Sequence, residues 1–436
     1  MASRRIIVLL LLVASLVGAL VTGHGLFYNL LYLWLMLVVG AAVWTWTSLR
    51  QVRLSRHTHT LRAQVGHVFE ERLAIRNHSR LPKLWLEVRD HSDLPGHEAS
   101  QVVTSVDAGQ ERGWVVRTLC LRRGRYRLGP LSLTSGDPFG LFQVVHRLPE
   151  TASVLIYPAT VHLPDFALPL GLLSGGDALR RRTHQITANA STVRDYAPGD
   201  SLNRIHWRST ARRDRLMAKE FELDPQADVW LFLDGEGAAQ AGHEGPLPDP
   251  RVGGRWWEAL DTIQAAAARL PPTTEEYGVS VAASLAQFFV RRDRSVGLVA
   301  FGRTREVIQP DRGERQLLRL LETLAVFQAQ GRVPLRDALV LEAGQLPRGA
   351  TLVLITPSRD LRWVIETQAL RRRGLRTVAV VIDPSTFAEP SEHILSNAEL
   401  AETLLATQIL AYRVKEGDDL AVALTRGGQA TWHYSG

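Results

Sequence analysis

The N-terminus constrains this chain most, because two long runs of sequence there contain no charged residue. The first extends over residues 6–23 and the second over residues 26–46, with only two residues between them. Each run is close to the length that an α-helix needs to cross a bilayer core of about 30 Å at about 1.5 Å per residue. Because the second run follows at once, a transmembrane helical hairpin over residues 1–50 is favoured over a cleaved signal peptide.

Charges on either side of this hairpin predict its orientation. Arg4 and Arg5 precede it, Arg50, Arg53 and Arg56 follow it, and the connection carries no Lys or Arg. Basic flanks favour the cytoplasmic side. The sequence therefore predicts a plasma-membrane protein with two transmembrane helices, contact with the lipid bilayer through residues 6–46, and both termini in the cytoplasm. A net charge of +7 suits a body held beside an anionic leaflet.

Residues 51–160 show apolar side chains with period two. In the run ERLAIRN, for example, Leu73 and Ile75 alternate with polar or small residues. Several short alternating runs separated by turn residues predict an antiparallel β-sandwich domain. The single cysteine, Cys120, excludes an intramolecular disulfide, and its position in an alternating run predicts a buried structural thiol.

The pattern changes after a connecting segment at residues 161–225. The expected strands are DVWLFLD, SVGLVAFG, ATLVLITPS, LRTVAVVIDP and ILAYRVK. The expected helices are RWWEALDTIQAAAARL, EEYGVSVAASLAQFFVRR, ERQLLRLLETLAVFQAQ and DLRWVIETQALRRRG. Strands that alternate with helices predict a parallel, doubly wound α/β sheet over residues 226–436.

The connecting segment contains VRDYAPGDSLNRIHWRSTARRDRLMAKEFE, residues 193–222, in which basic and acidic residues are interleaved. As an active site it would offer Asp200, His206 and Ser209. However, no nucleophile elbow of the G-x-S-x-G type and no separate acid to orient the histidine are evident. The interleaved acids also disfavour a nucleic-acid clamp, and no nucleic-acid partner is expected.

Two interpretations of this segment stay open. It is either a surface for a protein partner, since Arg and Trp are enriched in interface hot spots, or an internal staple between the two domains. In the second case Ile205, Trp207 and Leu216 would pack on the α/β domain. The two interpretations are compatible with each other.

These residues also carry a resemblance to a known family. The run RDYAPGDSLNRIHWRSTAR…RLMAKEFE resembles the signature of the domain-of-unknown-function family 58, in which a Tyr, a Gly-Asp pair, an Ile-(Asp or His)-Trp and an Ala-Arg recur in this order. The run RGRYRLGPLSLTSGDPFGLFQ, residues 123–143, resembles the second hallmark of the family. The signature positions, and so the candidate partner-binding residues, are Arg194, Tyr196, Gly199, Asp200, Arg204, His206, Trp207, Arg208, Arg212 and Arg213.

The resemblance implies a membrane-anchored protein with a von Willebrand factor type A-like, Rossmann-like C-terminal domain that associates with a MoxR-type AAA+ ATPase. A type A domain that binds Mg²⁺ usually has Asp-x-Ser-x-Ser after its first strand, with a Thr and an Asp from later loops. Here Asp234 is followed by Glu236 and Ala238, and Val333 and Pro357 stand at the later positions. We therefore expect no metal and no cofactor, with Asp234 as a remnant of such a site.

Together these features predict a cytoplasm-facing protein-interaction scaffold or adaptor on a membrane anchor, working with a MoxR-type ATPase and not itself an enzyme. The alternative is a cell-envelope-related enzyme or an accessory subunit of one. An intact set of catalytic residues would favour that alternative, and the sequence offers none that we can identify.

Overall fold

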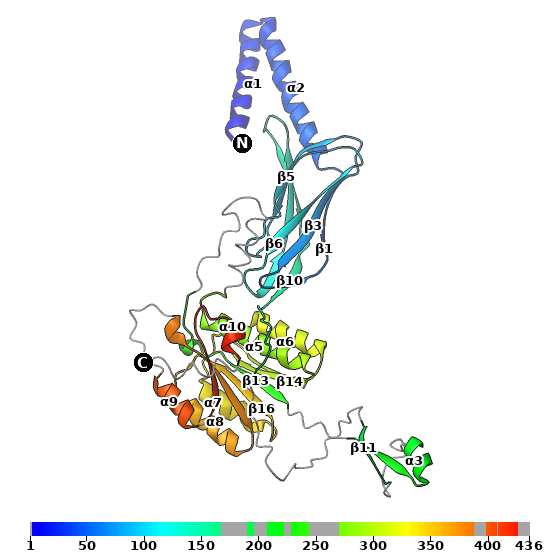
Figure 1. The fold of residues 1–436 in the computed structure, drawn as a ribbon. Helices are drawn as coiled ribbons and strands as arrows, with labels where there is room; N and C mark the ends of the chain where they lie inside the picture. The colour runs from blue at the N-terminus through cyan, green and yellow to red at the C-terminus, as the bar shows by residue number, and fades with distance from the viewer. Residues whose placement is uncertain are drawn as a thin grey trace.

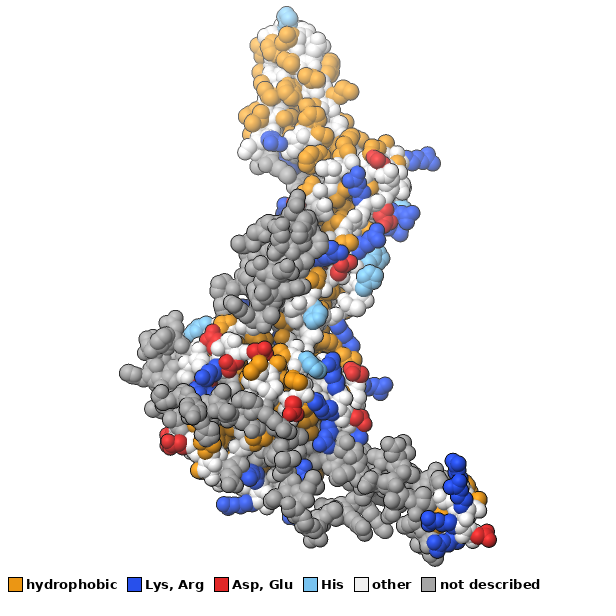
Figure 2. All heavy atoms as spheres, in the orientation of Figure 1, with side chains coloured by type: hydrophobic (Ala, Val, Ile, Leu, Met, Phe, Trp, Pro, Cys, Tyr) orange, Lys and Arg blue, Asp and Glu red, His pale blue; other side chains and the backbone are white. Residues whose placement is uncertain are grey.

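The computed structural model describes residues 2–166, 190–195, 207–221, 228–243, 270–387, 398–407 and 409–425. Its first two elements are long helices, α1 (Ala2–Thr22) and α2 (Gly25–Ser48), which form a projecting hairpin (Figure 1). Both are long and apolar enough to cross a membrane. Hydrophobic side chains cover the visible face of this hairpin (Figure 2).

The next part of the chain consists of short strands in three sheets. One sheet has the order β1-β3-β6 and the facing one β5-β4-β8-β9, both antiparallel, while a small third sheet has the order β2-β10-β7. The bounds are β1 (Val52–Thr58), β2 (Arg62–Gln64), β3 (Val68–Asn77), β4 (Lys83–Asp90), β5 (Gln101–Val106), β6 (Glu111–Leu119), β7 (Gly124–Leu128), β8 (Leu131–Gly136), β9 (Gln143–Leu148) and β10 (Ala152–Tyr157).

Alternation along these strands produces a sandwich-like core, as the period-two pattern predicts. Leu73 and Ile75 of β3 and Leu86 and Val88 of β4 are all fully buried between the two sheets. Cys120 is also buried, as expected. Burial raises the pKa of its thiol to about 11, so it stays protonated at neutral pH.

A six-stranded sheet with the order β15-β14-β13-β16-β17-β18 forms the later part of the chain. Its strands are β13 (Val229–Asp234), β14 (Val296–Phe301), β15 (Arg305–Asp311), β16 (Thr351–Thr356), β17 (Arg376–Ile382) and β18 (Leu410–Val414). All neighbours are parallel except β14 and β15, which pair antiparallel across the short turn between them. The sheet is therefore mixed, and the prediction of a wholly parallel sheet was wrong because this hairpin adds an antiparallel edge strand.

Helices cover both faces of this sheet. One face packs against α5 (Thr274–Arg291), α6 (Glu314–Val326) and α10 (Leu420–Ala423), and the other against α7 (Leu335–Glu342), α8 (Arg362–Arg372) and α9 (Ala398–Ala406). Among the described residues, three single turns of 3₁₀ helix accompany them: η2 (Gly237–Ala239), η3 (Ala343–Gln345) and η4 (Pro384–Thr386). The further helix predicted over RWWEALDTIQAAAARL lies outside the described residues.

Arg123 joins the sandwich to the α/β part. Its side chain, 4 % exposed, lies just before β7 and reaches across to α5 and α6. The guanidinium donates to a carboxylate oxygen of Glu275 at 2.6 Å and to the carbonyl oxygens of Leu324 at 3.2 Å and Phe327 at 2.9 Å, and it also contacts Glu276. The two parts therefore share a buried polar contact.

Candidate functional site

The carboxyl edge of the six-stranded sheet contains a point at which the direction of winding reverses. The chain forms β13, continues to β14 and β15 on one side, and returns to β16 on the other. In sheets of this topology, ligands bind outside the strand ends where the direction of winding reverses. Asp234, the last residue of β13, and Thr356, the last residue of β16, lie at that point.

Asp234 is buried at 4 % exposure and engaged in hydrogen bonds within the chain. The Thr356 hydroxyl donates to its Oδ2 at 2.6 Å, and the Glu236 backbone N–H donates to its Oδ1 at 3.0 Å. Burial raises the pKa of the Asp234 carboxyl to about 6, aided by the nearby Glu236 charge and opposed by these two hydrogen bonds. Ionisation of Asp234 consequently costs stability as the pH rises from about 4 through about 6.

The side chains around Asp234 match Mg²⁺ poorly. This ion requires near-octahedral oxygen ligands and usually keeps several waters. Both carboxylate oxygens of Asp234 already accept hydrogen bonds, and the Thr356 oxygen also accepts one from the Ser358 N–H at 2.8 Å. At the other expected ligand positions Val333 packs against the apolar core, and Pro357 has no oxygen in its side chain.

We therefore expect Mg²⁺ to leave the melting temperature of the protein unchanged. An ion bound at ~100 times its dissociation constant would raise the free energy of unfolding by about 2.7 kcal/mol, equivalent to several degrees. Thermal unfolding with Mg²⁺ and then with EDTA measures this. An EDTA-reversible increase that Asp234→Ala abolishes would contradict the expectation.

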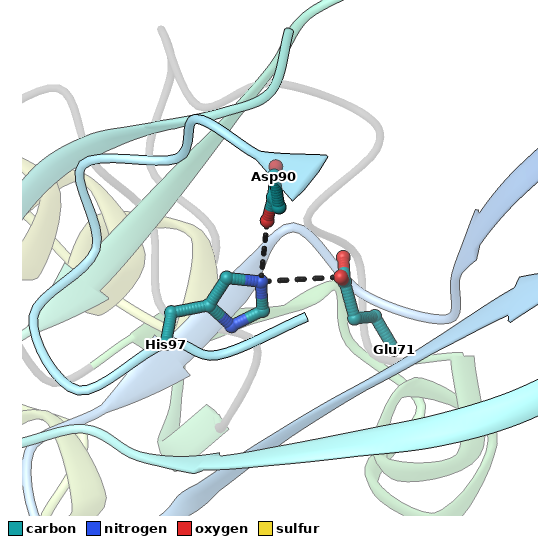
Figure 3. Close-up of side chains that lie close together, drawn as sticks. All are labelled: Glu71, Asp90 and His97. Atoms are coloured by element: carbon teal, nitrogen blue, oxygen red, sulfur yellow. Dashed lines mark hydrogen bonds and ion pairs between the residues drawn. The ribbon is translucent and has the colours of Figure 1, made fainter. Parts of the chain in front are cut away.

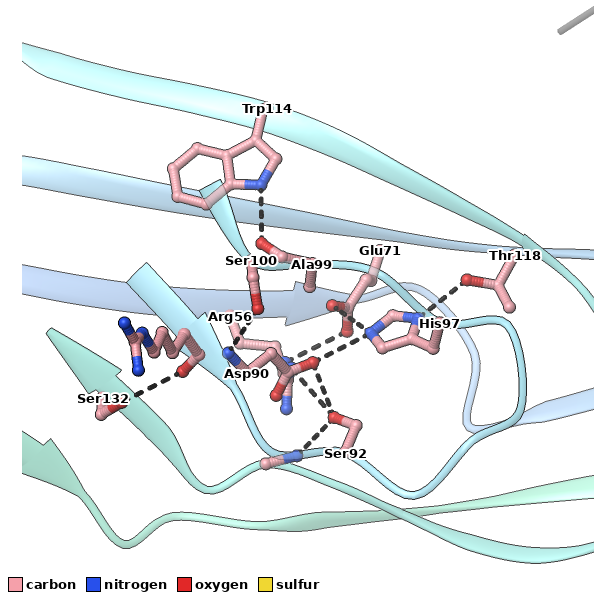
Figure 4. A network of polar contacts seen from close by, with 12 residues as sticks. Arg56, Glu71, Asp90, Ser92, His97, Ala99, Ser100, Trp114, Thr118 and Ser132 are labelled. Carbon is pink, nitrogen blue, oxygen red and sulfur yellow. Dashed lines mark hydrogen bonds and ion pairs between the residues drawn. The ribbon is translucent and has the colours of Figure 1, made fainter. Parts of the chain in front are cut away.

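A second cluster of polar side chains lies inside the β-sandwich and was missed by sequence reasoning. Arg56 of β1, Glu71 of β3, Asp90 at the end of β4 and His97 in the following loop meet there (Figure 3, Figure 4). Their side chains are between 0 and 11 % exposed. The signal in the sequence was Glu71, which shares the inward-facing period of Leu73 on β3.

The distances within this cluster are those of a charged network. The His97 Nε2 lies 3.1 Å from a carboxylate oxygen of Glu71 and 3.1 Å from one of Asp90. Arg56 lies 3.1 Å from the other Glu71 oxygen and 2.8 Å from the Asp90 Oδ2. The His97 Nδ1 contacts the Thr118 hydroxyl at 2.8 Å. Two cations thus face two carboxylates when His97 is protonated.

Protonation in this cluster follows from its partners. Burial alone would raise the pKa of Asp90, but hydrogen bonds from His97 and Ser92 and the charge of Arg56 outweigh it and lower that pKa to about 2. Burial alone would lower the pKa of His97, but its contacts with Asp90 and Glu71 outweigh this effect and raise it. Potential metal-ligand atoms of Glu71, Asp90 and His97 lie within 4.8 Å of one another. Arg56 together with protonated His97 balances the two carboxylates, so we interpret the cluster as a structural ion network.

The signature residues that the structure describes lie in a small unit of two strands and one helix. Strand β11 (Ala190–Asp195) pairs antiparallel with β12 (Met217–Phe221), and α3 (Trp207–Arg213) lies between them in the chain (Figure 1). Met217 is buried, and its N–H donates to the Thr210 hydroxyl at 3.0 Å, which ties α3 to β12.

Of the ten signature residues, five fall within the described residues. Arg194 is on β11, and Trp207, Arg208, Arg212 and Arg213 are on α3. The remaining ones, Tyr196, Gly199, Asp200, Arg204 and His206, lie outside the described residues.

Large apolar side chains on α3 and in the turn that follows it are exposed to solvent. Trp207 is 68 % exposed and Leu216 is 44 % exposed. The interpretation as an internal staple would have packed both side chains on the α/β domain, and their exposure does not agree with it. Ile205 lies outside the described residues. Arg208, Arg212 and Arg213 are exposed as well. The structure thus brings one aromatic ring and three guanidinium groups onto one short exposed helix.

The sequence model of the family described as "Protein of unknown function DUF58" matches residues 192–245, which include α3, β12 and β13. A curated relative, "Uncharacterized protein YeaD" of Bacillus subtilis (strain 168), is 21 % identical over 447 residues, covering 98 % of this chain and 96 % of that protein. Similarity to this relative therefore extends over all parts of the chain.

Two solved structures each resemble about a quarter of the chain. The CARDB domain of PF1109 from Pyrococcus furiosus is 15 % identical with a TM-score of 0.17, covering 24 % of this chain and 94 % of that one. A PapD-like domain of human CEP192 is 12 % identical with a TM-score of 0.17, covering 24 % and 86 %. At such scores neither likeness bears on function.

Proposed function

We propose that this protein is a membrane-anchored, cytoplasm-facing scaffold that docks a MoxR-type AAA+ ATPase and catalyses no reaction itself. The helical hairpin would be the anchor, the β-sandwich a spacer, and the mixed sheet with its helices a type A-like domain. The observation that carries the proposal is that the family match at residues 192–245 includes α3, whose Trp207 and arginines are exposed.

Charge and residue type support a protein partner for this helix. Trp and Arg are the residues most enriched in interface hot spots, where they lose their contact with water on binding. An exposed Trp207 beside Arg208, Arg212 and Arg213 offers such contacts before a partner is present. The basic flanks of the hairpin, including Arg4, Arg5 and Arg50, support a cytoplasmic body, where an ATPase has its nucleotide.

Removing two outward arginines of α3 should weaken partner capture and leave folding intact. Exposed charges contribute only ~0–1 kcal/mol to stability, whereas an interface Arg can contribute 2 kcal/mol or more to binding. The variant Arg208→Ala with Arg213→Ala should therefore lose roughly 30-fold or more in affinity for the ATPase. Pull-down of the ATPase on the full chain in nanodiscs, alongside thermal unfolding, measures both quantities.

A matched control removes two exposed arginines from α6 instead of from α3. Arg315 and Arg319 are both exposed on α6, so Arg315→Ala with Arg319→Ala should bind the ATPase as the unaltered protein does. The α3 hypothesis fails if the Arg208 and Arg213 variant captures the ATPase at full yield. It also fails if that variant melts far below the unaltered protein, because α3 would then be an internal staple.

A further inference from the structure

The turn between β8 and β9, Asp137–Phe142, lies against the start of the membrane hairpin. The Arg4 guanidinium donates to the Phe139 carbonyl oxygen at 3.4 Å, and Arg5 donates to that of Leu141. The Arg5 guanidinium also lies 5.7 Å from the centre of the Phe142 ring. We call this turn the β8–β9 tip. These contacts place the β8–β9 tip beside the N-terminal end of α1, where the apolar run of the helix begins.

The second helix ends at the same part of the sandwich. Lys83, buried at the start of β4, donates through its Nζ to the Thr47 carbonyl oxygen near the end of α2 at 2.6 Å. The Ser135 hydroxyl donates to the Leu84 carbonyl oxygen at 3.4 Å, so this end of β4 adjoins the strand that leads into the β8–β9 tip. Trp85 is exposed there at 65 %.

Most backbone N–H groups of the β8–β9 tip donate hydrogen bonds to acceptors within the tip itself. The Asp137 carboxylate accepts hydrogen bonds from the N–H groups of Phe139 and Phe142, and the Gly140 N–H donates to the Asp137 carbonyl oxygen at 3.1 Å. Pro138 has no N–H to satisfy. Backbone polar groups without partners are what keeps a loop out of lipid, so this turn can approach apolar surroundings at low cost.

The β8–β9 tip also exposes apolar side chains at its apex. Phe139 is 54 % exposed, and Pro138 beside it is exposed too. An apolar apex with arginines at its base is the arrangement by which a segment lies in the headgroup and acyl boundary of a bilayer. Aromatic side chains such as Trp85 and Trp46, which is 64 % exposed, favour the same layer.

We propose that the β8–β9 tip dips into the interfacial layer of the lipid bilayer through Phe139, so that the sandwich is held against the membrane. This inference rests on the proposed insertion of α1 and α2. It assigns lipid contact to residues 137–142, beyond the helices themselves. The tip and the hairpin together would fix the orientation of the whole body relative to the membrane plane.

An environment-sensitive fluorophore on single cysteines tests the proposal in the full chain reconstituted into vesicles. Cys120 can stay, because it is buried and its pKa is raised to about 11, which makes the thiol unreactive at neutral pH. The labelled positions are Phe139→Cys at the tip, Leu10→Cys within α1, and Val68→Cys at the far end of the sandwich. All three side chains are exposed in the structure.

Quenching by spin-labelled lipids is the measurement. The label at position 139 should emit at shorter wavelength than that at position 68 and lose most of its emission to lipids spin-labelled near the headgroup. The label at position 10 should respond most to lipids spin-labelled deep in the acyl chains, and that at position 68 to neither. Quenching at position 10 without quenching at position 139 overturns the proposal and leaves the anchor intact. Absence of quenching at both positions overturns the anchor and the proposal together.

Discussion

Replacing Arg56 with Ala should destabilise the protein by about 3–5 kcal/mol, as expected when one partner of a buried ion pair is removed. The guanidinium lies 3.1 Å from Glu71 and 2.8 Å from Asp90, whose side chains are 0 % and 3 % exposed. Without it, two buried carboxylates face His97 alone. Chemical denaturation of the purified protein measures the loss, and the double variant with Glu71→Gln should recover part of it.

The neighbouring strand positions provide a matched control. Glu70 and Glu71 point to opposite faces of β3, and Glu70 pairs with Arg117 at 2.9 Å with both side chains about half exposed. Arg117→Ala should therefore cost only ~0–1 kcal/mol. Equal losses from Arg56→Ala and Arg117→Ala would show that the buried network contributes no more than a surface pair.

The same network sets a pH dependence with a known sign. The pKa of Asp90 is lowered to about 2, so its contribution is present above its ordinary pKa and is lost as the pH falls from about 4 to about 2. The pKa of His97 is raised, so its contribution is present below about 6.5 and is lost as the pH rises through the folded value. The network therefore stabilises the fold most between about pH 4 and pH 6.5. Because the charge of Arg56 helps to lower the pKa of Asp90, Arg56→Ala should reduce the stability that is lost as the pH falls from about 4 to about 2.

Replacing Arg123 with Ala should uncouple the sandwich from the α/β part, at a cost of about 3–5 kcal/mol. Its guanidinium contacts Glu275 and Glu276 in the first turn of α5 and the carbonyl oxygens of Leu324 and Phe327 near the end of α6. Without the guanidinium, these carboxylates and carbonyl oxygens would lose a hydrogen-bond donor. We expect unfolding in two separate transitions and faster hydrogen exchange along α6.

A second ion pair across the same boundary is the control. Arg62 and Glu322 lie 2.7 Å apart, but their side chains are 56 % and 38 % exposed. Arg62→Ala should leave a single transition and change stability by only ~0–1 kcal/mol. If Arg123→Ala behaves in the same way, the apolar contacts of Tyr157, Leu163 and Phe166 hold the two parts together without it.

Several strand positions followed from the sequence because their burial alternates or is continuous, whereas the helices α7 and α9 were not predicted. The alternation around Leu73 and the apolar run ending at Asp234 are typical of a half-buried and a fully buried strand, and both occupy those places. The antiparallel β15 was missed because REVIQPD lies on a sheet edge, with mixed exposure and no clear apolar period.

Candidate sites were harder to predict because their residues are distant in sequence. Arg56, Glu71, Asp90 and His97 come from four different segments, and only the fold brings them together. For Trp207 the sequence left open whether the ring is buried as an internal staple or exposed as a docking surface, and the structure shows it exposed on the short helix α3. For the run at residues 123–143, the sequence offered a resemblance to a family hallmark and no prediction of its contacts. The structure places its first residue at the contact with α5 and α6 and its DPFGLF end beside α1.

Direct binding to a MoxR-type ATPase tests the proposed scaffold most directly. The full chain would be reconstituted in nanodiscs and titrated with the purified MoxR-type ATPase of the same organism, once with ATP and once without nucleotide. We predict saturable binding whose affinity differs between the two nucleotide conditions, as expected of a docking partner of a nucleotide-driven machine. A folded, reconstituted chain that binds the ATPase in neither condition would contradict the proposed function.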